Sequence, residues 1–212
     1  MPEDPFELFA DDYDAWYDRH AHAYRSELRA IRRVIGSSGR ALEVGVGTGR
    51  FAGPLGLRFG LDPAFAMLRR ARERGLSVVG GVGERLPFRA RSFDRVLIAL
   101  TLCYFDAPDA ALHEARRVLR PAGRLVIGFL DPTSPPGRRY RKGRRGRFYE
   151  EAEFRGPAEV EQLLDAAGFR PARWAQTLFR RPEELGAPER PRPGSGSGIF
   201  VVVEARVRDG GG

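Results

Sequence analysis

The segment best suited to chemistry is a glycine-rich loop that follows a short apolar run at residues 41–46. Gly45, Gly47 and Gly49 stand at alternate positions, and Arg50 occupies the place where a dinucleotide-binding fingerprint needs its third glycine. Glycine tolerates positive φ and lets the backbone approach a ligand closely, so the loop predicts a nucleotide-like ligand at the end of a strand. A tight strand-to-helix turn without a ligand is the competing interpretation.

Two carboxylates near this loop narrow the ligand class. Glu43 stands two residues before the first glycine, where a carboxylate disfavours a pyrophosphate and favours a cation. Asp62 ends the next apolar run, where an acid accepts hydrogen bonds from ribose hydroxyls in nucleotide-binding α/β sheets. Asp62 followed by Pro63 also fits a helix start with an aspartate N-cap, and the two roles are compatible.

Short apolar runs alternate with amphipathic segments along most of the chain. The expected strands are residues 41–46, 56–61, 76–79, 93–100, 124–130, 169–179 and 199–207. The expected helices are residues 11–35, 64–73, 109–119 and 157–167. This alternation predicts an α/β fold with an open, mostly parallel sheet and helices on both faces. Residues 131–156 are expected to form an irregular insertion, and residues 180–198 a loop.

Composition excludes several classes of protein. With 212 residues, the chain is long enough to bury a substantial core in one domain. Its single cysteine, Cys103, gives no sign of a disulfide framework and favours a reducing compartment. The apolar stretch 96–105 is far shorter than the roughly 20 residues that span a bilayer, and residues 1–30 do not resemble a signal peptide. We therefore expect a soluble, cytoplasmic monomer or homodimer without a membrane span or a bound metal.

The formal net charge of +8 suggests a nucleic-acid partner, but its distribution weakens that interpretation. Lys142 is the only lysine among 36 basic residues, a skew typical of genome-wide codon bias. Seven of the basic residues lie in the run 138–147, and the rest of the chain carries 29 basic and 28 acidic side chains. The positive charge is therefore local.

The segments around the glycine loop resemble the class I S-adenosylmethionine-dependent methyltransferases, in particular the small-molecule branch that includes the ubiquinone and menaquinone biosynthesis enzymes. ALEVGVGTGRFA resembles the first motif of that family and GLDPAFAMLRRARERG the second. VVGGVGERLPFRARSFDRVLIALTLCYF resembles the adenine-binding loop with the fourth strand, and ALHEARRVLRPAGRLVIG the following helix and fifth strand. PAEVEQLLDAAGF at 157–169 adds a further piece.

The resemblance implies a Rossmann-like class I fold with a seven-stranded sheet, S-adenosyl-L-methionine as cofactor and S-adenosyl-L-homocysteine as product. It implies one domain, with a helical cap at 1–40, a cofactor-binding core at 41–130, a basic insertion or lid at 131–156 and the last helix and strands at 157–212. The implied cofactor contacts are Gly45, Gly47 and Gly49 around the methionine part, Glu43 near its ammonium, Asp62 and Pro63 at the ribose, Gly83 and Glu84 beside the adenine, and Leu100 and Thr101 beside the sulfonium.

One departure from the family concerns the adenine. Many relatives carry an aspartate two residues before the glutamate of this loop, where it bonds the adenine amino group, but this chain has Val82 there. The adenine contact is therefore expected to depend on backbone groups and Glu84. An exposed loop carboxylate is the competing interpretation of Glu84.

The acceptor is harder to predict, because methyl transfer depends mainly on proximity and needs a base only when the nucleophile must lose a proton. Residues 99–102, Ala-Leu-Thr-Leu, lack the motif of enzymes that methylate exocyclic base or glutamine nitrogens, and Cys103 lacks the proline of cytosine-C5 enzymes. Aromatic side chains of two variable segments are expected to line an acceptor pocket: Tyr13, Trp16, Tyr17, His20 and Tyr24, with Tyr140, Phe148 and Tyr149. His20, Tyr17 and Tyr13 are the candidate bases, and ordinary helix packing is the competing interpretation.

Three interpretations of the basic run 138–147 remain open: a solvated loop, a site for an anionic small substrate, or a track for an RNA backbone. We rank a small-molecule acceptor first, because the rest of the chain is nearly neutral and no RNA-binding module is appended. RNA methylation and noncatalytic cofactor binding are the alternatives.

Alanine substitutions of the basic residues across 138–147 test this ranking. We expect the wild type to bind RNA only weakly at physiological salt, since phosphate contacts weaken steeply as salt rises. Filter binding at two salt concentrations is the measurement. Tight RNA binding that the substitutions abolish would make RNA the preferred acceptor.

Overall fold

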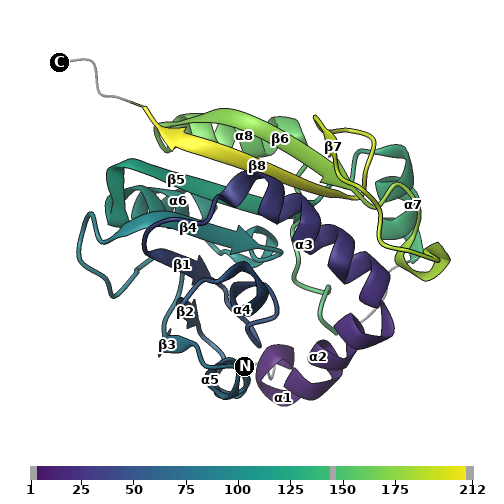
Figure 1. Cartoon of the computed structure of the whole chain (residues 1–212), viewed down its shortest axis with the longest axis horizontal. Coiled ribbons are helices and arrows are strands. Elements are labelled where there is room, and N and C mark those ends of the chain that lie inside the picture. The colour runs from purple at the N-terminus through teal and green to yellow at the C-terminus, as the bar shows by residue number, and fades with distance from the viewer. Residues whose placement is uncertain (1–3, 144–146, 209–212) are drawn as a thin grey trace.

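A single sheet with the strand order β3-β2-β1-β4-β5-β8-β6-β7 forms the centre of the computed structural model (Figure 1). The described residues are 4–143 and 147–208, apart from the side chains of 141–143. The strands are β1 (Ala41–Val44), β2 (Phe59–Asp62), β3 (Ser77–Gly80), β4 (Phe93–Ala99), β5 (Leu119–Leu130), β6 (Phe169–Thr177), β7 (Arg192–Pro193) and β8 (Phe200–Val207). The expected class I fold is confirmed, with eight strands in place of seven: β7 is a two-residue strand within the segment expected to be a loop.

The first five strands pair in parallel, and the last three are joined to them antiparallel. The chain reverses its direction of progress across the sheet between β1 and β4, which are neighbours. In open α/β sheets, ligands bind outside the carboxyl ends of the strands at such a switch point. The topology therefore places the site beyond residues 44 and 99.

Helices cover both faces of the sheet. They are α1 (Pro5–Leu8), α2 (Ala10–Arg19), α3 (Ala21–Ile35), α4 (Ala52–Leu55), α5 (Phe65–Glu73), α6 (Pro108–Val118), α7 (Pro135–Gly143) and α8 (Pro157–Ala166), with 3-10 turns η1 (Leu102–Tyr104) and η2 (Pro182–Glu184). The α3 helix lies on one face, and α6 and α8 lie on the other (Figure 1). The side chains of β8 show the two layers: Val202 packs with α3, whereas Val201 and Val203 pack with α6 and α8.

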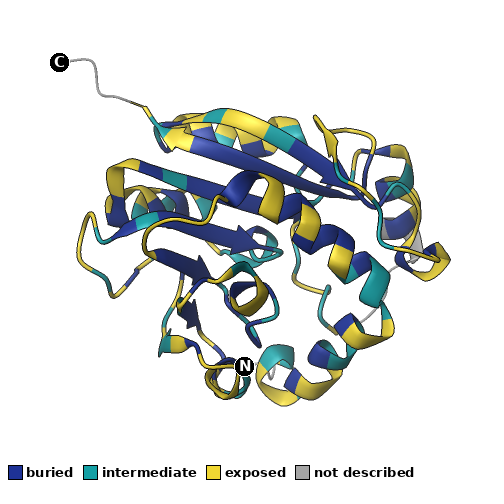
Figure 2. Cartoon of the chain, in the orientation of Figure 1, coloured by how far each residue is buried: buried dark blue, intermediate teal, exposed yellow. Residues whose placement is uncertain are grey.

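The central strands are buried on both faces, as Figure 2 shows, because the helices leave neither face to solvent. Buried β-branched and leucine side chains therefore follow one another along β4, from Val96 to Ile98, without polar alternation. No helix among the described residues is long and apolar enough to cross a membrane.

Two expected segments differ from the structure. The helix expected over 11–35 is divided at His20, whose φ of −114° and ψ of 45° leave the helical region, so α2 and α3 run in different directions. The insertion expected to be irregular contains α7, which Ser134 begins by accepting a hydrogen bond from the backbone of Gly137 (3.1 Å). A serine followed by Pro135 is a helix-start signal that the sequence does contain.

Candidate active site

The glycine loop connects β1 to α4 and needs glycine at two positions for steric reasons. Gly45 has a φ of +72°, and a Cβ there would lie 2.2 Å from Thr101. Gly49 has a φ of +85°, and a Cβ there would lie 2.7 Å from Leu76. The loop therefore packs tightly against the ends of neighbouring strands, while its middle glycine, Gly47, faces the ring of Tyr13.

Asp62, the last residue of β2, holds the loop by its side chain. One carboxylate oxygen accepts a hydrogen bond from the backbone N–H of Gly47 (2.8 Å) and the other from that of Ala64 (3.0 Å). The side chain is 8% exposed, and this burial raises the pKa of Asp62 to about 6, against the opposing effect of the two backbone donors. Pro63 is exposed beside it. Each oxygen of Asp62 retains lone pairs for further donors.

Glu43 lies inside β1, beneath the loop, and is 1% exposed. The backbone N–H of Ala52 bonds its carboxyl group, but Oε2 has no hydrogen-bond partner among the described residues. Burial raises the pKa of Glu43 well above its usual range, with a smaller contribution from the charge of Asp62. A cationic group placed nearby would reverse this effect, because an opposite charge favours the ionised carboxylate.

The residues expected at the adenine lie where the chain leaves β3. Gly83 is buried against the ring of Phe105, and Val82 is 46% exposed. The carboxylate of Glu84 accepts a hydrogen bond from the backbone N–H of Ala107 (3.4 Å), just before α6 begins at Pro108. Glu84 therefore has a structural contact that the sequence did not indicate.

Leu100 and Thr101 follow β4 directly and border the glycine loop. Leu100 has a φ of +59° and donates its N–H to the carbonyl of Gly128 (2.7 Å), which fixes this unusual conformation. The Thr101 hydroxyl donates toward the carbonyl of Gly45 (3.2 Å). The ends of β1 and β4 are thus joined where the topology places the site.

A charge network on α2 connects the N-terminal helices to the glycine loop. The Asp14 carboxylate accepts hydrogen bonds from Thr48 (2.5 Å), from Arg50 (2.5 and 2.9 Å) and from Arg74 (2.8 Å). Burial opposes ionisation of Asp14, but the hydrogen bonds from Arg50, Arg74 and Thr48 outweigh it and hold its pKa below the usual range. Asp18 pairs with the same Arg50 guanidinium (2.7 Å).

Further contacts attach the same helices to α5. The Glu7 carboxylate accepts from the backbone N–H of Ala66 (3.1 Å), and Asp11 pairs with Arg70. Phe6 and Ala10 pack against Met67 in a small separate hydrophobic cluster. Residues 5–19 are therefore held against the glycine loop and α5.

A cavity of about 480 Å³ lies between α2, the end of β4 and residues 147–155. Its lining residues are Asp12, Tyr13, Trp16, Tyr17, Arg19, Glu27, Leu100, Leu102, Cys103, Tyr104, Phe129, Leu130, Tyr140, Arg147, Phe148, Tyr149, Glu153, Phe154 and Arg155. The ring centroids of Tyr13 and Phe148 lie 5.6 Å apart, so α2 and residues 147–155 are in contact beside the cavity. The buried carboxylate of Glu27 was not anticipated.

The three candidate bases differ in their surroundings. Tyr13 and Tyr17 line the cavity with their hydroxyls 2.8 Å apart, and burial raises the pKa of both. His20 does not border the cavity: its ring stacks on Trp16 (4.6 Å) and its Nδ1 contacts the carbonyl of that residue (3.0 Å). Tyr24 bonds the carbonyl of Arg50 and lies outside the lining set.

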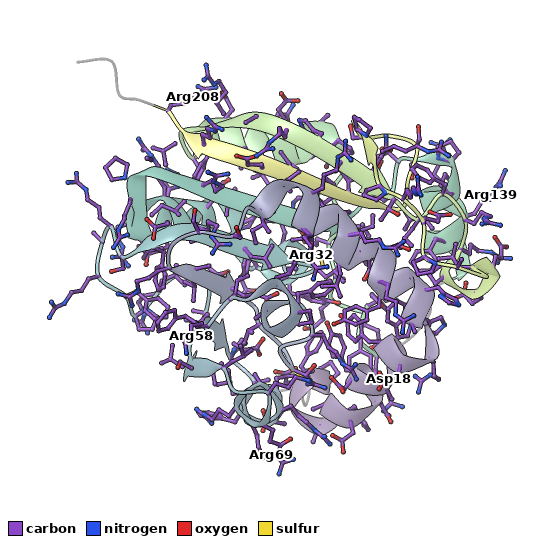
Figure 3. The ribbon with its side chains drawn as sticks, in the orientation of Figure 1. Asp18, Arg32, Arg58, Arg69, Arg139 and Arg208 are labelled. Carbon is purple, nitrogen blue, oxygen red and sulfur yellow. The ribbon has the colours of Figure 1, made fainter. Side chains whose placement is uncertain are left out.

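The basic run lies partly outside the described residues, which exclude 144–146 and the side chains of 141–143. At its end, Arg147 stacks over the ring of Phe9 (3.8 Å) and approaches Asp12 (3.7 Å). Elsewhere the arginines are dispersed: Arg32, Arg58, Arg69 and Arg208 project from separate parts of the surface (Figure 3).

Comparisons with known proteins show which family this chain resembles. The sequence matches the model of the methyltransferase domain family over residues 42–127. The crystal structure of a SAM-dependent methyltransferase of Thermotoga maritima, described as a possible histamine N-methyltransferase, is similar with a TM-score of 0.91 at 41% identity. That similarity covers 94% of this chain and 97% of the Thermotoga chain.

Two sequence relatives extend the comparison. A protein of Mycobacterium tuberculosis is 45% identical over 175 residues, which are 80% of this chain, and the match spans 61% of the longer relative. A ubiquinone/menaquinone biosynthesis C-methyltransferase of Bordetella bronchiseptica is 33% identical over 138 residues, 58% of this chain and 54% of its own length. The family resemblance drawn from the motifs is confirmed.

Replacement of Asp14 by asparagine tests the charge network. We expect a loss of about 3 kcal/mol in the free energy of unfolding at pH 7, because two guanidinium groups lose a shared, buried anion. Since the folded-state pKa of Asp14 lies below its unfolded value, the contribution is complete above about pH 4 and declines at lower pH. Urea denaturation of both proteins at pH 7 and at pH 3 measures this.

Asp18→Asn is the matched control, because Asp18 contacts the same arginine from a side chain that is 69% exposed. Because exposed ion pairs are screened by solvent and contribute little, Asp18→Asn should lower the free energy of unfolding much less than Asp14→Asn does. Equal effects of the two substitutions at pH 7 would show that the Asp14 network is not what secures α2.

Proposed function

The chain belongs to the S-adenosylmethionine-dependent methyltransferases, and from that premise we propose that it methylates a small molecule held in the aromatic cavity. The observation that carries this proposal is the position of the cavity: Leu100, which follows β4 beside the glycine loop, is also part of its wall. A donor bound at the loop and an acceptor bound in the cavity would therefore meet at the end of β4.

The residues around the loop fit the cofactor. Asp62 offers buried acceptor oxygens to ribose hydroxyls, and the unpartnered Oε2 of Glu43 suits the charge of the methionine ammonium, directly or through water. Gly45, Gly47 and Gly49 allow backbone approach. We assign Pro63, Gly83, Glu84 and Thr101 to the rim of the same site. The cofactor supplies a methyl group activated by a sulfonium.

The protein's contribution is to hold donor and acceptor in line and to exclude water. Tyr13 and Tyr17 keep their protons at neutral pH because burial raises their pKa, so they act as hydrogen-bond donors toward the acceptor and not as bases. His20 lies outside the cavity wall. None of the three candidate bases is therefore suited to remove a proton from the acceptor, and proximity and alignment promote the reaction.

A small molecule fits the aromatic cavity, with its volume of about 480 Å³, better than RNA does. Arg147, at the end of the basic run, is directed to Phe9 and Asp12 on the N-terminal helices. Aromatic rings of α2 and of residues 147–155 line the cavity in which we place the acceptor. The intact acids and glycines of the loop give no reason to propose a noncatalytic role.

Filling the cavity tests the location of the acceptor. Cys103→Phe places a bulky ring in the wall and should lower methyl transfer to the natural acceptor by about 100-fold, because small displacements from alignment are that costly. The affinity for S-adenosylhomocysteine should change less than about threefold. Transfer of labelled methyl groups in a cell extract, with the product identified by mass, is the measurement.

Cys103→Ala is the matched control at the same position, since it removes the sulfur without adding volume. Its activity should remain near that of the wild type. An equally active Cys103→Phe enzyme, or label that appears only in RNA, would contradict the proposed acceptor site.

The pKa of Asp62 predicts a pH dependence of cofactor binding. Ribose hydroxyls bond the ionised carboxylate more strongly, so the affinity for S-adenosylhomocysteine should rise as pH increases through about 6. Asp62→Asn should bind about tenfold more weakly at pH 8 and should lose this rise. Calorimetry between pH 5 and pH 8 checks it. A wild-type affinity independent of pH would remove Asp62 from the ribose contact.

A further inference from the structure

A second cavity, of about 220 Å³, adjoins the acceptor cavity at the carboxyl end of β5. The two share Leu130, Tyr140, Tyr149 and Phe154 as lining residues. We call the smaller space the annex. A molecule bound beside Leu100 in the main cavity could therefore extend past these aromatic side chains into the annex.

Asp131 borders the annex and is 1% exposed. Its Oδ1 accepts hydrogen bonds from the backbone N–H (2.8 Å) and the hydroxyl (2.6 Å) of Thr133, which accounts for that oxygen. Its Oδ2 is also buried but has no hydrogen-bond partner among the described residues. The turn before α7 therefore uses Oδ1 of Asp131, whereas Oδ2 has no structural role that the described residues show.

An unpartnered carboxylate oxygen in a buried position is unfavourable unless something binds it. Tyr140, Tyr149 and Phe154 line the annex together with Asp131, and the faces of aromatic rings attract cations. A carboxylate among aromatic rings is a combination that suits a protonated amine and repels an anion.

Three described arginines near the two cavities bond groups other than Asp131. Arg138, in α7, donates to the carbonyl of Thr133, and Arg155 donates to Glu153 (2.7 Å). Arg147 lies over Phe9 and approaches Asp12. Among the side chains that the structure describes, none bonds Oδ2 of Asp131.

We propose that the annex anchors a protonated amine of the acceptor through Oδ2 of Asp131, while a second atom of the same molecule is methylated in the main cavity. This inference rests on the proposed methyl transfer. The anchored ammonium has no lone pair and does not react. The second atom uses its lone pair to take the methyl group, the C–S bond of the sulfonium breaks, and the sulfur leaves as a neutral thioether. The acceptor class is therefore a small molecule with a cationic amine at one end and a nucleophilic atom at the other.

A series of probes that differ only in charge tests the anchor. The probes are 2-phenylethylamine, 2-phenylethanol and phenylacetate, and their binding is measured by calorimetry with and without saturating S-adenosylhomocysteine. We expect the wild type to prefer the amine over the alcohol by roughly tenfold or more and to bind phenylacetate most weakly, as for hydrogen bonds to a charged group.

Asp131→Asn keeps an acceptor for Thr133 and removes the charge at the other position. It should lower the affinity for the amine by roughly tenfold to a hundredfold and leave the affinity for the alcohol within about threefold. Asp106→Asn, the same change at an exposed residue, is the matched control and should keep the wild-type preference. Thermal melting and the affinity for S-adenosylhomocysteine establish that each variant is folded.

Equal binding of the three probes by the wild type would overturn the proposal, and so would an undiminished preference in Asp131→Asn. If that variant does not fold, the wild-type series decides alone. Failure of S-adenosylhomocysteine to bind the wild type would instead contradict the proposed function, and the series without it would still test the annex.

Discussion

The arrangement of the site depends on one buried anion, the carboxylate of Asp14, which binds both the glycine loop and the C-terminal end of α5. Its partners Thr48 and Arg50 belong to the glycine loop, and Arg74 follows α5. Apolar packing also holds these helices, because Tyr17 of α2 and one side of α3 belong to the main hydrophobic cluster. Asp14 adds a buried charge that joins α2 directly to the glycine loop. The cavity is thus a consequence of charge pairing as much as of hydrophobic packing.

The carboxyl ends of the parallel strands collect acids that are costly to bury. Glu43 and Asp62 both have raised pKa values, and burial is the main cause for each. A packed core would gain stability from apolar residues at these positions, since buried charges rarely repay their desolvation. Their presence is understandable where a bound ligand supplies the missing donors, and functional sites commonly concentrate such perturbed groups. The unpartnered oxygen of Asp131 is likewise understandable where a bound ligand supplies the missing donor.

Most of the fold could be predicted from the sequence because its signals are local. The apolar run of β4 predicts a buried strand, and the glycines after β1 predict the turn that follows it, each from a few neighbouring residues. The role of Asp14 could not be predicted from local sequence signals, because its partners lie 34 to 60 positions away. A partial signal existed: Asp11, Asp14 and Asp18 recur at helical spacing, opposite an aromatic face, as do Arg70 and Arg74. The helix break at His20 could not be predicted because the amphipathic pattern continues through it. The start of α7 was hidden by the arginine-rich composition of its segment.

The α2 helix both lines the acceptor cavity and binds the glycine loop, and this double role has a thermodynamic consequence. Tyr13 and Tyr17 face the cavity, and Asp14 between them fastens the same helix to the loop. A ligand that orders either side of this helix reduces the cost of ordering the other side. Such coupling is reciprocal. If a bound acceptor orders α2 and thereby strengthens cofactor binding, a bound cofactor must strengthen acceptor binding by the same factor.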